Sequence, residues 1–268
     1  MDPGATLTAG MAGLLTGLAF LAGLIDAIAG GGGLLVLPAL LLAGFQPASA
    51  LAVNKLQASF GSGSATVAFT RAGLIDWPRT APMFAMAMGG SVAGALLVSA
   101  LPTGFLRAFM PPMLVAIALY MGFSPRLGDD DREQRLTPAA FTLTAAPAIG
   151  FYDGVFGPGT GSLLMLAFVG LLGLGITRAT GRAKALNFAS NAGALAILAV
   201  TQPIAWPLGL LMGAAAFAGA RIGAGLAIRN GARLIRPLLV LACCAMALRL
   251  FLDEAGPWRA LAGKIFGS

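Results

Sequence analysis

The sequence contains no histidine and only two cysteines, and both shortages narrow the chemistry that the chain can perform. Without histidine there is no Ser-His or Cys-His nucleophile pair, no histidine metal site and no histidine acid–base catalysis. Cys243 and Cys244 are adjacent in an apolar run, which is a poor geometry for a mutual disulfide and supplies too few ligands for a metal cage. We therefore expect no metal, no cofactor and no enzymatic activity.

Charged residues are also scarce. They make up 10% of the 268 residues, against roughly a quarter in soluble proteins, and 58% of the residues are hydrophobic. A folded surface with so little charge would aggregate in water, so the sequence predicts a protein of the lipid bilayer. The net charge of +7 would suggest nucleic-acid binding in a soluble protein, but here the basic residues lie mainly in short loops between apolar runs. We expect no nucleic-acid partner.

Apolar segments that could enter a hydrocarbon core of ~30 Å fall into two sets of five. We expect helices at about 7–28, 33–45, 50–70, 80–101 and 105–123, and again at about 138–155, 161–175, 180–201, 206–227 and 233–252. The second segment of each set is short for a full crossing at ~1.5 Å per residue. The N-terminal sequence lacks the Lys/Arg cluster of a signal peptide, so we expect no cleavage there.

The two sets of segments resemble copies of one unit. Asp26 and the glycines after it are echoed by Asp153 and its glycines, and Lys184 follows Lys55 by 129 residues, as Trp206 follows Trp77. Shared apolar composition alone would not align these polar residues. The sequence therefore predicts a first transmembrane repeat at 1–123, a charged cytoplasmic linker at 124–137 and a second transmembrane repeat at 138–268.

Loop charges predict that the two repeats are inverted. The loops at 71–79, 124–137, 176–184 and 228–236 carry arginines, whereas those at 46–54 and 202–206 carry none. Because basic loops favour the cytoplasmic side, all of them lie there only if the repeats have opposite orientations. An odd number of crossings per repeat, such as a broken-helix hairpin plus three spans, meets this requirement. We expect an all-α polytopic bundle of two such inverted-topology repeats; the alternative is a parallel arrangement with four spans each.

Each repeat contains a glycine cluster shortly after an intramembrane aspartate. A glycine costs ~1 kcal/mol in a helix, and a break leaves backbone groups that hydrocarbon cannot satisfy. Such a break survives where it lines a cavity, and the helix after it directs free N–H groups at the occupant. We expect two facing breaks that form one anion site near the midplane. Its glycines are Gly30, Gly31, Gly32 and Gly33 in one repeat and Gly157, Gly159 and Gly161 in the other.

Charges inside the apolar segments each cost ~2.5–3.5 kcal/mol or more unless they are paired or hydrated. Lys55 and Lys184 lie near amide side chains, and this combination suits an oxyanion, although snorkelling to an interface is the alternative for the lysines. Asp26 and Asp153 are either proton-coupling carboxylates or fixed partners that neutralise the lysines. The amides assigned to the site are Asn54 and Gln57 in the first repeat and Asn187 and Asn191 in the second.

Other glycine pairs have the spacing that allows close helix packing in membranes. They are Gly13 with Gly17, Gly90 with Gly94, Gly209 with Gly213 and Gly219 with Gly223. We expect these pairs to hold helices together and to have no role in binding.

Four motifs together span most of the chain: DAIAGGGGLLVLPALL at 26–41, PASALAVNKLQ at 47–57, GFYDGVFGPGTGS at 150–162 and KALNFASNAGA at 184–194. In these motifs the sequence resembles the sulfite exporter TauE/SafE family of membrane transporters. The resemblance implies a carrier, linked to an ion gradient or to protons, that moves sulfite, sulfoacetate or a similar small sulfur-containing anion outward. By resemblance, the glycine-rich and Asn-Lys positions would line the permeation path.

We therefore expect a multi-pass protein of the bacterial cytoplasmic (inner) membrane that works as a secondary transporter. Its expected function is export of sulfite or an organosulfonate. Its partners would be the bilayer, the small anionic substrate and protons as the candidate coupling ion. A passive anion channel is the alternative, because it needs the same electropositive path but no coupling carboxylate. Neither the oligomeric state nor the identity of the anion follows from the sequence.

Overall fold

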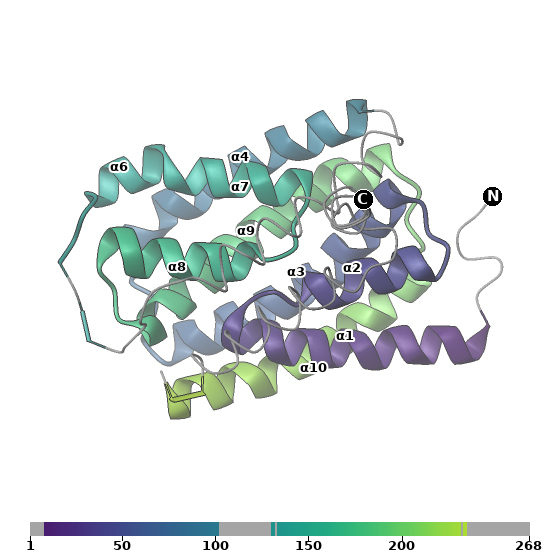
Figure 1. The fold of residues 1–268 in the computed structure, drawn as a ribbon, viewed down its shortest axis with the longest axis horizontal. Helices are drawn as coiled ribbons and strands as arrows, with labels where there is room; N and C mark the ends of the chain where they lie inside the picture. The colour runs from purple at the N-terminus through teal and green to yellow at the C-terminus, as the bar shows by residue number, and fades with distance from the viewer. Residues whose placement is uncertain (1–7, 102–129, 132, 232, 235–268) are drawn as a thin grey trace, which may run out of the picture.

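The computed structural model describes residues 8–101, 130–131, 133–231 and 233–234, and all regular structure in these residues is helical. Figure 1 shows the helices running roughly along one common axis. The segment expected at 105–123, and that at 233–252 beyond residue 234, lie outside the described residues. The helices are α1 (Ala9–Ala29), α2 (Gly33–Leu42), α3 (Pro47–Arg71), α4 (Trp77–Ala100), α6 (Pro138–Leu143), α7 (Ala145–Val155), α8 (Thr160–Leu172), α9 (Ile176–Thr201) and α10 (Trp206–Asn230).

Four of these helices, α1, α4, α9 and α10, are long and apolar enough to cross a membrane. With 21 to 26 residues each, they reach roughly 32–39 Å at the usual helical rise. Large apolar side chains such as Leu21 on α1 and Leu97 on α4 are exposed on the outside of the bundle. In water such a surface would promote aggregation, whereas in a bilayer it faces lipid. The protein is therefore an integral membrane protein.

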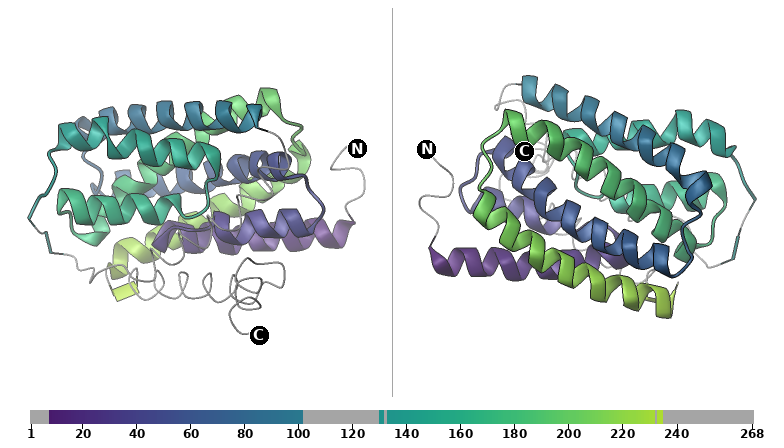
Figure 2. Two further views of the ribbon diagram at one scale, coloured as in Figure 1. Left: turned by 45° about the horizontal axis from the view of Figure 1, so that its top comes forward. Right: turned by 180° about the vertical axis from the view of Figure 1, so that it is seen from behind.

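Two pairs of helices fold back inside the bundle from opposite ends (Figures 1 and 2). α1 runs inward from the end where the described chain begins and α2 returns toward that end, while α7 and α8 do the same from the other end. α1 stops because Gly30 and Gly31 have φ values of 81° and 93°, which disfavour any side chain. The two turns meet inside the bundle, since a Cβ on Gly30 would lie 2.3 Å from the backbone nitrogen of Ser162.

The central helices are α3 and α9, which pack against each other. α10 packs on α3 and α1, and α4 packs on α9 and α7. Most residues of α3 and of α9 are buried by other helices. This explains how both helices carry polar residues, because protein and not lipid surrounds them.

Glycines allow the outer helices to approach closely. A Cβ on Gly219 of α10 would lie 2.0 Å from the carbonyl oxygen of Phe20 on α1, and one on Gly90 of α4 would lie 2.2 Å from that of Pro147 on α7. The packing role is confirmed for three of the four predicted pairs. For Gly13 and Gly17 it stays a prediction, because both glycines are exposed and no described atom lies within 4 Å of a Cβ there.

Three predicted boundaries are wrong. The loops expected at 46–54 and 176–184 are largely the first turns of α3 and α9, whose polar residues were taken for loop residues. Pro47 occupies the first turn of α3, a position that proline tolerates. The helix expected at 138–155 is divided into α6 and α7 at Thr144. Pro147 explains the division, because it has no N–H for the carbonyl oxygen four residues earlier.

The linker is attached to the end of the bundle where the described arginines gather. Asp131 accepts a 2.7 Å hydrogen bond from the backbone N–H of Gly175, just before α9, and forms an ion pair with Arg178. The hydrogen bond from Gly175 lowers the pKa of the Asp131 carboxyl, and Arg178 lowers it further. The connections at 43–46 and 202–205, at the other end of the bundle, contain no basic residue.

Candidate functional site

A cavity lies where the turns of the two folded-back pairs meet α3, α9 and α10. The cavity is small: the space open to the centre of a water molecule is about 30 Å³. Most residues that the sequence assigned to the site line this cavity, whereas Gly30, Lys55, Lys184 and Asp153 lie behind its wall. The predicted residues that line it are Asp26, Gly31, Gly32, Gly33, Asn54, Gln57, Gly157, Gly159, Gly161, Asn187 and Asn191.

Sequence reasoning missed several small residues of the cavity wall. Ala58 and Gly61 of α3 could have been found, because they are four and seven residues after Asn54 and so share its helical face. Thr160 lies inside the second glycine motif, and its hydroxyl donates a 2.8 Å hydrogen bond to the carbonyl oxygen of Gly157. The remaining wall residues are Ala22, Gly23, Ser62 and Ala216. Their small size leaves room in the cavity.

Both turns present backbone donors at the start of a helix. The N–H groups of Gly33, at the start of α2, and of Gly161, in the first turn of α8, have no hydrogen-bond partner among the described residues. The first N–H groups of any helix lack an intrahelical partner and carry the positive end of its dipole. These donors line a cavity where an anion could accept their hydrogen bonds.

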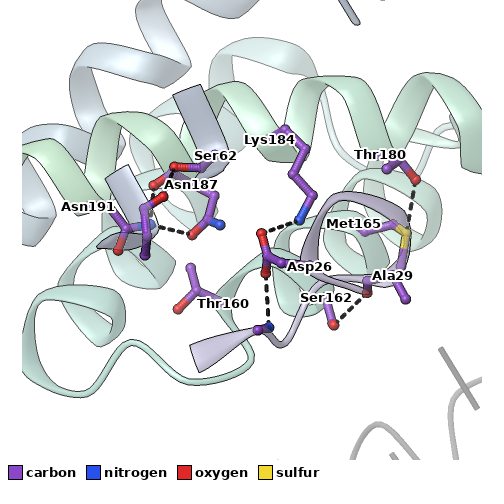
Figure 3. Close-up of polar contacts among 12 residues, drawn as sticks. Asp26, Ala29, Ser62, Thr160, Ser162, Met165, Thr180, Lys184, Asn187 and Asn191 are labelled. Carbon is purple, nitrogen blue, oxygen red and sulfur yellow. Dashed lines mark hydrogen bonds and ion pairs between the residues drawn. The ribbon is translucent and has the colours of Figure 1, made fainter. Parts of the chain in front are cut away.

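Two side-chain amides add donors next to these N–H groups. The Nδ2 atom of Asn54 lies 3.3 Å from the position that a Cβ on Gly33 would take, and that of Asn187 lies 3.5 Å from the corresponding position on Gly161. Gln57 donates to Oδ1 of Asn54 at 3.0 Å. Asn191 donates to Oδ1 of Asn187 at 3.1 Å, as Figure 3 shows. Because the amide oxygens of Asn54 and Asn187 accept these bonds, their NH₂ groups are turned to the cavity.

The two aspartates and two lysines assigned to the site form two ion pairs that cross between the halves of the chain. Asp26 of α1 contacts Lys184 of α9, with 2.9 Å between Oδ2 and Nζ (Figure 3). Lys55 of α3 contacts Asp153 of α7, with 2.8 Å between Nζ and Oδ2. Both lysines are at most 1% exposed, so they do not snorkel to an interface. Each lysine is neutralised by the aspartate of the other half.

The two pairs differ in their surroundings. Asp26 is 19% exposed, lines the cavity and also accepts a 3.1 Å hydrogen bond from the N–H of Gly32. Asp153 is 1% exposed, and its Oδ1 has no hydrogen-bond partner among the described residues. Lys55 and Asp153 touch without the alignment of a hydrogen bond. The pair of Asp26 and Lys184 therefore borders the cavity. The pair of Lys55 and Asp153, called the sealed pair below, is enclosed by protein.

Glycines are all that separate the ammonium groups from the cavity. A Cβ on Gly161 would lie 3.0 Å from Nζ of Lys184, and one on Gly157 would lie 2.8 Å from Nζ of Lys55. Hydroxyl groups hold the two turns in place. Ser162 donates a 2.8 Å hydrogen bond to the carbonyl oxygen of Ala29 in the first half, as Figure 3 shows. The site thus combines helix starts, amides and ion pairs in one enclosed volume.

A bundle of long apolar helices around a polar cavity with buried ion pairs is typical of membrane transporters, whose substrate sites lie at helix breaks inside the bilayer. Comparison with known proteins bears this out. The family model described as sulfite exporter TauE/SafE matches residues 15–250, and the chain belongs to this family. The resemblance seen in the sequence motifs is confirmed.

Bacterial relatives of similar length carry the same general description. The chain is 50% identical to the probable membrane transporter protein ORF9 of Sinorhizobium sp, over 90% of this chain and 92% of the relative. It is 44% identical to the probable membrane transporter protein YfcA of Escherichia coli K12, over 91% of each chain, and 41% identical to a probable membrane transporter protein of Haemophilus influenzae, over 95% and 98%. No solved structure matches the chain. The protein is a membrane transporter.

Proposed function

We propose that the protein is a secondary transporter that exports a small sulfur-containing anion, such as sulfite or an organosulfonate, across the bacterial inner membrane. The observation that carries the proposal is the cavity between the two turns, with its converging N–H and amide donors. The description of the family, sulfite exporter, supports the substrate class.

The chemistry of the cavity suits an oxyanion. Gly33 and Gly161 offer backbone N–H groups, and Asn54 and Asn187 offer NH₂ groups, so donors approach from both halves of the chain. An oxyanion with several acceptor oxygens could use all of them at once, and hydrogen bonds to a charged group are worth about 1.5–3 kcal/mol each. Among the described residues, a cation would find one carboxylate on the wall, that of Asp26, and this carboxylate is already paired.

The helix packing supports inverted repeats and a mechanism of alternating access. If α1 and α2 correspond to α7 and α8, α3 to α9, and α4 to α10, then each contact has a counterpart. α1 packs on α10 as α7 packs on α4, and α3 packs on α10 as α9 packs on α4. A two-fold axis relates contacts in this way, and an axis in the membrane plane is favoured because α1 and α7 run inward from opposite ends of the bundle (Figure 1). One half would then rock against the other around the shared cavity, with the arginine-rich end in the cytoplasm.

Sulfite flux into proteoliposomes tests the proposal. Gly33→Ala is the informative variant, because alanine favours helix by ~1 kcal/mol over glycine, yet its Cβ would lie 3.3 Å from Nδ2 of Asn54 inside the cavity. Gly170→Ala in α8 is the matched control, since no described atom lies within 4 Å of a Cβ there. The methyl group of Gly33→Ala should displace the Asn54 amide, which then loses its charge-assisted hydrogen bond to the anion. We expect this loss to reduce sulfite flux by about tenfold or more, and we expect no reduction in Gly170→Ala.

The same assay separates a carrier from a channel. A carrier coupled to a second ion accumulates sulfite against its concentration gradient when the gradient of that ion is imposed, whereas a channel only dissipates gradients. If neither sulfite nor sulfoacetate enters vesicles that contain the wild-type protein faster than protein-free vesicles, the proposed function is wrong. Equal sulfite flux in Gly33→Ala and Gly170→Ala would instead show that the anion does not bind at the first glycine turn.

A further inference from the structure

The two crossed ion pairs have equal chemistry but unequal access to the cavity. Asp26 lines the cavity and is 19% exposed, so water and protons that enter the cavity can reach its carboxylate. Asp153 and Lys55 are 1% and 0% exposed and do not line the cavity. A glycine lies beside each ammonium group, Gly161 at Lys184 and Gly157 at Lys55, so the difference in access comes from the aspartates: Asp26 lines the cavity and Asp153 does not.

The two oxygens of Asp26 have different partners, which allows one contact to break while the other remains. Oδ1 accepts the N–H of Gly32 at 3.1 Å, and Oδ2 contacts Nζ of Lys184 at 2.9 Å. A proton on Oδ2 would remove the attraction to Lys184, yet Oδ1 would still accept from Gly32 and hold the carboxyl group in place. Lys184 would then keep its positive charge without a counter-ion.

We infer that Asp26 and Lys184 form the coupling pair, in which Lys184 exchanges the carboxylate of Asp26 for the transported anion when Asp26 takes up a proton. Lys55 and Asp153 form a closed pair that positions α3 against α7 throughout the cycle. This inference rests on the proposed function. It assigns ion coupling to one pair and helix positioning to the other, a difference that the sequence does not show. Lys184 is close enough for this exchange, because its ammonium group lies 2.9 Å from Oδ2 of Asp26, which lines the cavity.

The charge balance of the exchange fixes how protons and anions move together. The carboxylate of Asp26 gains one proton from water in the cavity and becomes neutral, and the released ammonium of Lys184 is compensated by one negative charge of the anion. On the other side the anion leaves, the proton leaves Oδ2, and the ion pair forms again. The proton and the anion therefore travel in the same direction. With a dianion the loaded site carries a net charge of −1, which a membrane potential that is negative inside drives outward.

No other charged group of the described helices competes for Asp26. α2 and α8, which pack against α1, contain no charged residue. On α3, Lys55 is held by Asp153, and on α9, Arg182 contacts Asp76. On α10, Arg221 is exposed on the surface of the helix. Lys184 is thus the one cation of the described chain in contact with Asp26.

Proton counting in proteoliposomes tests the inference, with sulfite as the probe at a mildly alkaline pH where it is mostly a dianion. A trapped pH-sensitive dye reports protons, and labelled sulfite reports the anion. We expect wild-type protein to carry one proton with each sulfite, beyond the protonation of sulfite seen in protein-free vesicles. We also expect an imposed pH gradient to drive sulfite uphill in wild-type protein, whereas Asp26→Asn supports only downhill flux.

The possible results separate this inference from the proposed function. If wild-type sulfite flux carries no additional proton, or if Asp26→Asn still accumulates sulfite uphill, the coupling role of Asp26 is wrong while the transport function stands. If wild-type protein moves no sulfite, the proposed function itself fails. Because passage of bisulfite would also carry one proton per sulfite, the wild-type count is repeated with sulfoacetate, which is fully ionised at this pH. Sulfoacetate flux without an additional proton contradicts the inference even if Asp26→Asn does not fold.

Discussion

Removing one partner of the sealed ion pair should destabilise the protein strongly. Asp153→Asn leaves Lys55, which is 0% exposed, without its counter-ion. Breaking a buried ion pair by removing one partner costs about 3–5 kcal/mol, because the remaining charge is neither solvated nor compensated. For a domain of this size, that corresponds to a decrease in melting temperature on the order of 10 °C.

The double variant Asp153→Asn/Lys55→Met is the matched control. It removes both charges and keeps a side chain of similar volume, so most of the lost stability should return. Thermal unfolding in detergent compares four proteins under one condition: wild type, Asp153→Asn, Lys55→Met and the double variant. The pair should therefore show a coupling free energy of about 3 kcal/mol in a double-mutant cycle.

The two ion pairs should contribute differently to stability. Asp26→Asn should cost less than Asp153→Asn, because Asp26 lines the cavity and ions or water there can compensate Lys184. If Asp26→Asn and Asp153→Asn lower the melting temperature equally, exposure does not determine what the pairs contribute. If Asp153→Asn has no effect, Lys55 is not held as a buried charge, and the closed role of that pair is wrong.

Three further predictions concern packing, topology and pH. Gly90→Ala should lose about 1–3 kcal/mol of stability, because its Cβ would lie 2.2 Å from a backbone carbonyl oxygen of α7, whereas Gly89→Ala beside it, with no described atom within 4 Å, should lose none in the same thermal assay. With the native cysteines replaced, Ala72→Cys, just after α3, should react with an impermeant maleimide only from the cytoplasm, whereas Gln202→Cys, just after the corresponding helix α9, should react from outside the cell; labelling of both from the same side would contradict the inverted arrangement. Because the pKa of Asp131 is lowered in the folded protein, its contribution to stability is present above about pH 4 and is lost as the pH falls, so Asp131→Asn should lower the melting temperature at neutral pH and match wild type in acid.

Much of the site could be predicted because a bilayer makes its components costly. Glycine runs and charges inside apolar segments are expensive in hydrocarbon, so Gly30 to Gly33 and Lys184 were recognisable from the sequence alone. The helix starts of α3 and α9 were missed for the same reason. Their polar first turns read as loops, and only the packing of these helices at the centre of the bundle shows why such turns are tolerated.

The pairing of the charges was beyond the sequence. Each half contains one aspartate and one lysine within its apolar segments, so pairing within a half and pairing across the halves are equally consistent with the sequence. The choice depends on how the two folded-back pairs interleave: the turn after α1 meets the start of α8, which brings Asp26 beside Lys184. The unequal exposure of the two aspartates depends on the same contacts, and a nearly repeated sequence gives no sign of it.

Crossed pairs have a consequence for motion that pairs within one half would not have. Asp26 and Lys55 belong to the first half of the chain and their partners belong to the second, so both ion pairs join the parts that alternating access moves. A sealed pair resists separation, because parting two buried charges leaves both uncompensated. A pair that lines the cavity can part, because water, a proton and an anion replace the lost contact. Relative motion of the halves should therefore turn about Lys55 and Asp153 and open at Asp26 and Lys184, which places the moving contact beside the substrate.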